Sequence, residues 1–121
     1  MKSFTDIEQS KKLASILPLE SADMFLALNG THPVMSKYID DGFVTADNTA
    51  IPCWSLAALL DILRNRAPSI EEDANVTLFS YRTVEWWDLT ICNSVIEPVT
   101  KSDPIDACVE MIIKLKEKNL L

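Results

Sequence analysis

The sequence predicts an α+β fold in which three helices pack against a small antiparallel sheet of four or five strands, in the order α-β-β-(β)-α-β-β-α. Apolar residues recur at helical spacing in three segments, whereas residues 76–81 and 84–92 are rich in β-branched and aromatic residues. With 121 residues and 48% apolar content, the chain is long and hydrophobic enough for a single compact domain spanning residues 1–121.

The first helix is expected to begin with a capping box. Thr5 is followed three residues later by Glu8, the spacing at which each side chain accepts a hydrogen bond from the other residue's backbone N–H. Pro18 is expected to end the helix, because proline lacks the N–H that a helix interior needs.

Residues 21–28 fit either a short helix or a strand. The dipeptides Asn29-Gly30 and Asp41-Gly42 favour the strand, because both supply the positive φ angles of tight hairpin turns. We therefore predict a meander of short strands, which occupy residues 24–28, 34–39 and 43–45.

A proline marks the expected start of each of the other two helices. The second is expected to follow Pro52, starting at Cys53 or Trp54, and to end at Arg64 before Pro68. Its apolar stripe consists of Leu56, Leu59, Leu60 and Leu63. The third is expected to follow the cap Asp103, with Pro104 in its first turn. Its stripe consists of Ile105, Cys108, Val109, Ile112 and Leu115.

Residues 76–81 and 84–92 are expected to form a hairpin with opposite faces of different character. Alternation places Trp87, Leu89 and Ile91 on one face of the second strand. Trp86 then falls on the other face, near Phe79, Tyr81 or Leu78. If helices cover only one face of the sheet, Trp86, Tyr81 and Phe79 form an exposed surface for a partner protein or a homodimer.

Charge and composition exclude several functional classes. A net charge of −7 argues against nucleic-acid binding, which needs clustered Lys and Arg. We expect a protein without a membrane partner, because the chain has neither an apolar signal segment nor a membrane-length apolar run. Three widely spaced cysteines predict a reducing, cytoplasmic location.

Few residues suggest chemistry, and we predict no cofactor and no metal site. His32 is the only histidine and hence the one candidate imidazole base. Cys53 is a candidate reactive thiol, because a helix N-terminus lowers the pKa of a cysteine. The acidic groups are interpreted as hydrated surface: Asp40 with Asp41, Glu71 with Glu72 and Asp73, and Glu85 with Asp88.

Four blocks carry a resemblance to a group of known proteins. They are residues 5–14 (TDIEQSKKLA), 20–24 (ESADM), 51–60 (IPCWSLAALL) and 103–112 (DPIDACVEMI). These blocks look like segments of small uncharacterised proteins encoded by gut bacteria and their mobile elements or prophages. The resemblance implies a bacterial cytoplasmic protein with a compact α+β fold, and it transfers no activity and no functional residue.

Three functional classes are compatible with these observations. The first is a non-catalytic adaptor or regulatory module that binds another protein. The second is an acidic antagonist of a nucleic-acid-binding or defence protein, in which carboxylates imitate phosphates. The third is a small-ligand binder or enzyme that uses Cys53 or His32 in a deep pocket.

Overall fold

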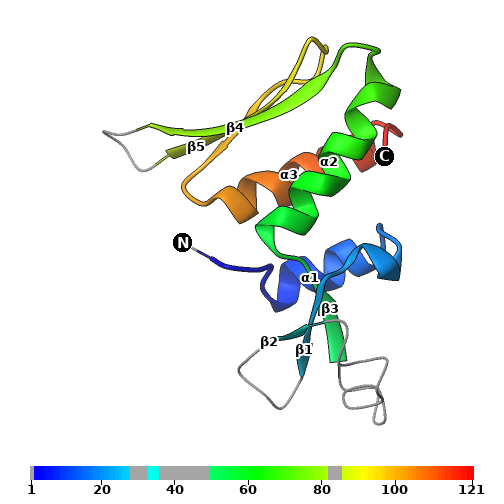
Figure 1. Cartoon of the computed structure of the whole chain (residues 1–121), viewed down its shortest axis with the longest axis vertical. Coiled ribbons are helices and arrows are strands. Elements are labelled where there is room, and N and C mark those ends of the chain that lie inside the picture. Colours follow the sequence, from blue (N-terminus) through cyan, green and yellow to red (C-terminus); the bar gives the residue numbers. More distant parts are fainter. Residues whose placement is uncertain (1, 28–32, 36–49, 82–85) are drawn as a thin grey trace.

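The computed structural model describes residues 2–27, 33–35, 50–81 and 86–121. This part of the chain contains the helices α1 (Ile7–Ala14), α2 (Leu56–Ile70) and α3 (Pro104–Glu117). The helices separate two antiparallel sheets that lie at opposite ends of the long axis of the molecule (Figure 1). The expected α+β class, the three helices and the approximate order of elements are confirmed.

The described strands are divided between two sheets, whereas the sequence suggested a single sheet. The first has the order β2-β1-β3, with β1 at Met24–Ala27, β2 at Pro33–Met35 and β3 at Ala50–Cys53. The second has the order β4-β5-β6, with β4 at Asn75–Tyr81, β5 at Trp86–Cys92 and β6 at Val99–Lys101. The 15 residues of α2 carry the chain about 22 Å from β3 towards β4. The two groups of strands are therefore held apart.

The main hydrophobic core lies between α2, α3 and the inner face of the second sheet. Helix α2 contacts β4, and α3 contacts β5 and β6. Every residue of the predicted α3 stripe is buried, which confirms it. Fully buried side chains in this core include Leu59, Leu63, Leu89, Ile91, Ile105, Met111, Ile112 and Leu115. Each such side chain contributes about 1.5–3 kcal/mol of burial free energy before entropy is subtracted.

Helix α3 begins as the sequence predicts. Asp103 is the N-cap, and its Oδ1 accepts hydrogen bonds from the backbone N–H of Ile105 at 2.8 Å and of Asp106 at 3.4 Å. Pro104 occupies the first turn, where the missing N–H has no intrahelical partner to lose.

The capping box of α1 is one residue further along than predicted. Asp6, not Thr5, is the N-cap, and its side chain accepts from the backbone N–H of Gln9 while the Gln9 side chain accepts from the backbone N–H of Asp6. Thr5 is fully buried, where its Oγ1 lies 2.7 Å from Oγ of Ser10 and accepts a hydrogen bond from the backbone N–H of Trp54. The threonine hydroxyl is therefore used in tertiary hydrogen bonds and does not cap the helix.

Helix α2 begins later than predicted, at Leu56, and Pro52 lies in strand β3 instead of opening the helix. Strand β3 is an edge of the first sheet, and an edge strand tolerates proline because the missing N–H need not enter the ladder. Ser55 is the N-cap and accepts from the backbone N–H of Ala58 at 3.2 Å. Its own N–H and hydroxyl donate to the carboxylate of Asp23, which orients the cap.

Helix α2 also ends later than predicted, at Ile70 instead of Arg64, with Pro68 inside the helix. A proline in the last turn removes only its own hydrogen bond, whose acceptor would be the carbonyl of Arg64. Arg64 is exposed, so water can replace that bond. The backbone N–H of Glu71 still donates to the carbonyl of Ala67 at 3.2 Å.

The strand interpretation of residues 24–27 is confirmed, because β1 pairs with both β2 and β3. Residues 19–21 form a short 3-10 helix before it. The expected turns at Asn29-Gly30 and Asp41-Gly42 and the expected strand at residues 43–45 lie outside the described residues. Strand β6 was not predicted, since three residues are too few to show a period.

Candidate functional site

The second sheet has two faces of different character, and the alternation predicted from the sequence produces them. Strands β4 and β5 pair without interruption from Asn75 opposite Cys92 to Tyr81 opposite Trp86. Leu89 and Ile91 are buried against the helices. Trp87, which shares their face at the end of the strand, is half-buried.

The outer face exposes two large aromatic side chains. Phe79 retains 46% of its surface and Trp86 retains 45%. Both residues alternate with inward-facing positions, and Phe79 lies opposite Asp88 while Trp86 lies opposite Tyr81. The side chain of Tyr81 is outside the described part of the structure. We call Phe79 and Trp86 the aromatic patch.

No described helix covers the aromatic patch. Helices α2 and α3 both lie on the other side of the second sheet, towards the middle of the molecule (Figure 1). The described surroundings of the patch are polar: Thr77 and Thr100 are exposed, and Thr90 donates to Oδ1 of Asp88 at 3.3 Å. An apolar centre with a polar rim is the usual composition of a protein interface.

Cys53 does not occupy the environment that its candidacy as a reactive thiol required. It ends strand β3, two residues before the cap of α2, and its side chain is fully buried. Burial raises the pKa of Cys53 to about 11, and the charge of Asp23 adds to the rise. The thiol is therefore protonated at neutral pH and shielded from solvent, whereas a nucleophilic cysteine needs a lowered pKa and access.

The other sequence candidates are not brought together by the described structure. His32, Asp40, Asp41 and Glu85 lie outside the described residues. The acidic segment at residues 71–73 is exposed after α2. Across the described ranges, no group of three or more His, Cys, Asp or Glu side chains is arranged to hold a metal ion.

Among the described helices, none is both long and apolar enough to span a bilayer.

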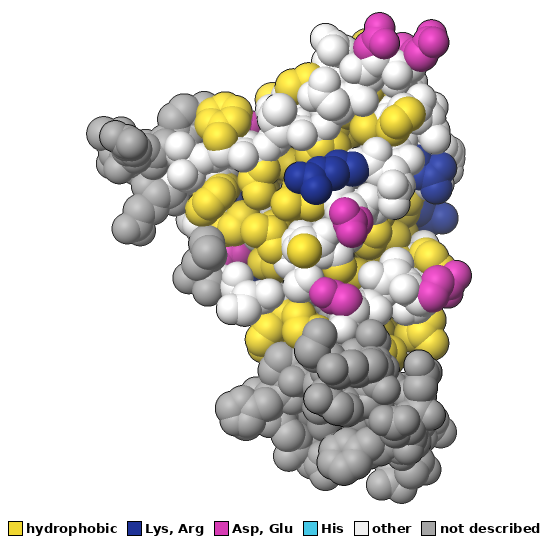
Figure 2. Space-filling model, in the orientation of Figure 1, with side chains coloured by type: hydrophobic (Ala, Val, Ile, Leu, Met, Phe, Trp, Pro, Cys, Tyr) yellow, Lys and Arg dark blue, Asp and Glu magenta, His cyan; other side chains and the backbone are white. Residues whose placement is uncertain are grey.

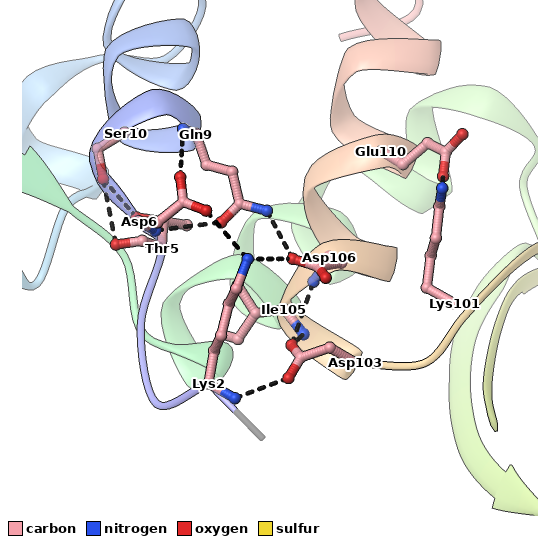
Figure 3. A network of polar contacts seen from close by, with 10 residues as sticks. All are labelled: Lys2, Thr5, Asp6, Gln9, Ser10, Lys101, Asp103, Ile105, Asp106 and Glu110. Atoms are coloured by element: carbon pink, nitrogen blue, oxygen red, sulfur yellow. Dashed lines mark hydrogen bonds and ion pairs between the residues drawn. The ribbon is translucent and has the colours of Figure 1, made fainter. Parts of the chain in front are cut away.

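A polar network that was not predicted joins the N-terminal segment to α3 (Figure 3). The ammonium group of Lys2 lies 3.0 Å from Oδ2 of Asp6 and 2.7 Å from Oδ1 of Asp106. Gln9 donates to the same oxygen of Asp106 at 2.7 Å, and the backbone N–H of Lys2 donates to Oδ2 of Asp103 at 2.7 Å. The spacing of Lys2 and Asp6 is visible in the sequence, but the contacts with α3 span about a hundred residues.

Electrostatics within this network favour the charged forms of its ions. Partial burial acts to lower the pKa of Lys2, but hydrogen bonds to Asp106 and Asp6 and their charges outweigh it and raise the pKa. The backbone N–H of Gln9 lowers the pKa of Asp6, and Lys2 contributes to the same shift.

The network lines a groove of about 540 Å³ between α1 and α3. Among the described side chains, no buried nitrogen or oxygen lacks a hydrogen-bond partner. The groove therefore presents no unsatisfied polar group that calls for a ligand, and its ion pairs fasten the N-terminal segment onto α3.

Searches with this chain against models of protein families, against curated proteins and against solved structures found no match.

Proposed function

We propose that this protein is a non-catalytic adaptor or regulatory module that binds another protein through the aromatic patch. The observation that supports the proposal is that Phe79 and Trp86 are nearly half exposed on a sheet face without a covering helix among the described residues. Large aromatics are costly to leave in water and are enriched at the centres of interfaces.

The size of the patch is adequate for a binding anchor. Aromatic side chains each offer about 150–250 Å² for burial, so the exposed fractions of Phe79 and Trp86 amount to roughly 140–230 Å² together. At about 25 cal/mol per Å², covering them contributes about 3–6 kcal/mol before the costs of association are subtracted. A contribution of this size is typical of an interface hot spot.

Charge gives less support to an acidic antagonist of a nucleic-acid-binding protein. Such a mimic needs its carboxylates gathered on one surface. On the face shown in Figure 2, acidic side chains are scattered among apolar and basic ones. We therefore favour the adaptor, and we place it in the bacterial cytoplasm on the resemblance of its sequence blocks.

Affinity capture from an extract of the source cells tests the proposal. The baits are the wild type, the double variant Phe79→Ser/Trp86→Ser and the control Leu19→Ser, which changes a 60% exposed leucine outside the second sheet. Bound proteins are quantified by mass spectrometry, and circular dichroism confirms that each bait is folded.

We expect proteins that the wild type and Leu19→Ser retain equally and that the double variant loses at least tenfold. Retention by all three baits, or no protein retained by the wild type, would contradict a binding role for the patch.

A further inference from the structure

Strand β4 forms an edge of the second sheet and lacks the features that keep sheet edges apart. In the described residues it pairs only with β5, along all seven of its residues and without a bulge. Its sequence, NVTLFSY, contains no charged residue and no proline. Natural edge strands are usually short, or they carry lysine, proline or bulges that prevent pairing with another chain.

The other described sheet edges carry such protection. Strand β6 is only three residues long and ends in Lys101, which is paired with Glu110 at 2.9 Å. In the first sheet, the edge strands β2 and β3 contain Pro33 and Pro52. Among the described sheet edges, that of β4 alone lacks these features.

We propose that β4 pairs antiparallel with β4 of a second copy of this chain, so that the two second sheets join into one six-stranded sheet. A two-fold axis places each strand opposite itself, so the pairing needs no partner beyond this sequence. The chain carries a net charge of −7, and the uncharged β4 is an edge along which two copies approach without opposing like charges.

The side chains of β4 suit this self-pairing. In a register centred on Leu78, Thr77 lies opposite Phe79 of the second copy, and the same pair occurs twice because of the two-fold axis. Pairs of an aromatic and a β-branched residue are among the favourable cross-strand combinations. On the inner face, the half-buried Leu78 lies opposite its own counterpart.

Helix α2 extends the same side of the molecule. In the view of Figure 1, β4 and α2 lie in front of β5 and α3. Figure 2 shows this side, where apolar side chains lie between the hairpin and α2, with a basic side chain among them. Val76 and Leu78 of β4 and Leu60 of α2 are only half-buried in the single chain. Edge pairing would bring α2 of one copy towards α2 of the other and cover these side chains.

The dimensions of this side predict a weak, reversible dimer. Seven strand residues are about 24 Å long, and a sheet with one helix layer is about 20 Å deep. The two copies together would bury on the order of 1,000 Å², which is the lower limit for a specific interface. We expect a dissociation constant in the micromolar range.

The dimer extends the proposed function, because it places two aromatic patches on one continuous sheet face. The two ideas can fail separately. Pairing is tested at the edge of β4, in a variant that keeps both Phe79 and Trp86. Partner capture is tested by replacing these two aromatic residues, which lie on the outer face of β4 and β5, with Leu19→Ser as the control.

Sedimentation equilibrium between about 1 and 500 µM tests the dimer in the full chain. The wild type should change from 13.6 kDa to about twice that mass as concentration rises. Thr77→Lys places a charge on the exposed outer face of β4 and should raise the dissociation constant at least about tenfold. Thr100→Lys makes the same change on the same face at the opposite edge, β6, and should leave the constant unaltered.

A wild type that stays monomeric throughout this range overturns the proposal, as does a dimer that both variants weaken equally or that neither weakens. Amide hydrogen exchange on the wild type provides a measurement that needs no variant. Alternate backbone N–H groups of β4 should become more protected at high concentration, whereas those of β6 should not change. Unchanged protection in β4 of a dimeric sample also refutes the edge pairing.

Discussion

Replacing Asp103 by alanine is expected to lower the free energy of unfolding by about 1.5–3 kcal/mol. The carboxylate of Asp103 is 8% exposed and accepts from three backbone N–H groups, those of Ile105, Asp106 and Lys2. Loss of an N-cap side chain costs about 0.5–2 kcal/mol. The N–H of Lys2, left without its 2.7 Å acceptor, adds about 1 kcal/mol.

Urea unfolding followed by tryptophan fluorescence measures this change through the transition midpoint. At an unfolding entropy of about 2.1 cal/mol/K per residue, the same loss lowers Tm by roughly 6–12 °C. Asp103→Asn is the matched control, because asparagine caps helices as well as aspartate but presents only one acceptor oxygen.

The asparagine variant should therefore lie between the wild type and Asp103→Ala, with the difference from the wild type reflecting the contact with Lys2. An alanine variant within about 0.5 kcal/mol of the wild type would refute the view that this carboxylate caps α3 and joins the N-terminal segment to it.

Two further predictions concern titratable groups. Burial raises the pKa of Cys53 to about 11 and of Cys108 to about 12. At pH 8, iodoacetamide should therefore modify the half-buried Cys92 much faster than these two buried cysteines, and the difference should disappear in urea. Equal rates for the three cysteines in the native protein, measured by mass spectrometry, would contradict this. The lowered pKa of Asp6 adds stability above pH 3.8, and this stability is lost as the pH falls through the folded-state pKa. The raised pKa of Lys2 adds stability below pH 10.5, and this stability is lost as the pH rises through the folded-state pKa. Asp6→Asn should therefore flatten the acid side of a plot of urea midpoint against pH, and Lys2→Met the alkaline side. An acid slope identical to wild type would count against the interactions of Asp6 with the N–H of Gln9 and with Lys2, and an unchanged alkaline slope against the ion pairs of Lys2.

Sequence reasoning located the aromatic patch because strand alternation is a local property. Once residues 86–92 are a strand, Trp86 and Trp87 must point to opposite faces, and the structure shows Trp86 exposed and Trp87 half-buried. Whether a helix covers the outer face was open in the sequence, because it depends on where α2 and α3 pack. The unprotected edge of β4 likewise became visible only with the strand order.

The helix boundaries show where local rules stop being sufficient. Asp103 and Pro104 were placed correctly because the cap and the first turn interact only with the residues that follow. Thr5 was placed wrongly because its hydroxyl binds Ser10 and Trp54 instead of the helix end. A capping motif thus identifies the start of a helix to within a residue, and tertiary hydrogen bonds choose between neighbouring candidates.

The α+β class, the three amphipathic helices and the alternation of the hairpin can be predicted from the sequence, because propensity and periodicity depend on residues one to four positions apart. The packing of the whole chain places the two sheets at opposite ends of the helices and brings Asp23 to the cap of α2 from 32 residues away. It also brings Lys2 to Asp106 across 104 residues. These contacts depend on how the whole chain folds, because distant polar groups meet only once the buried helices are packed together.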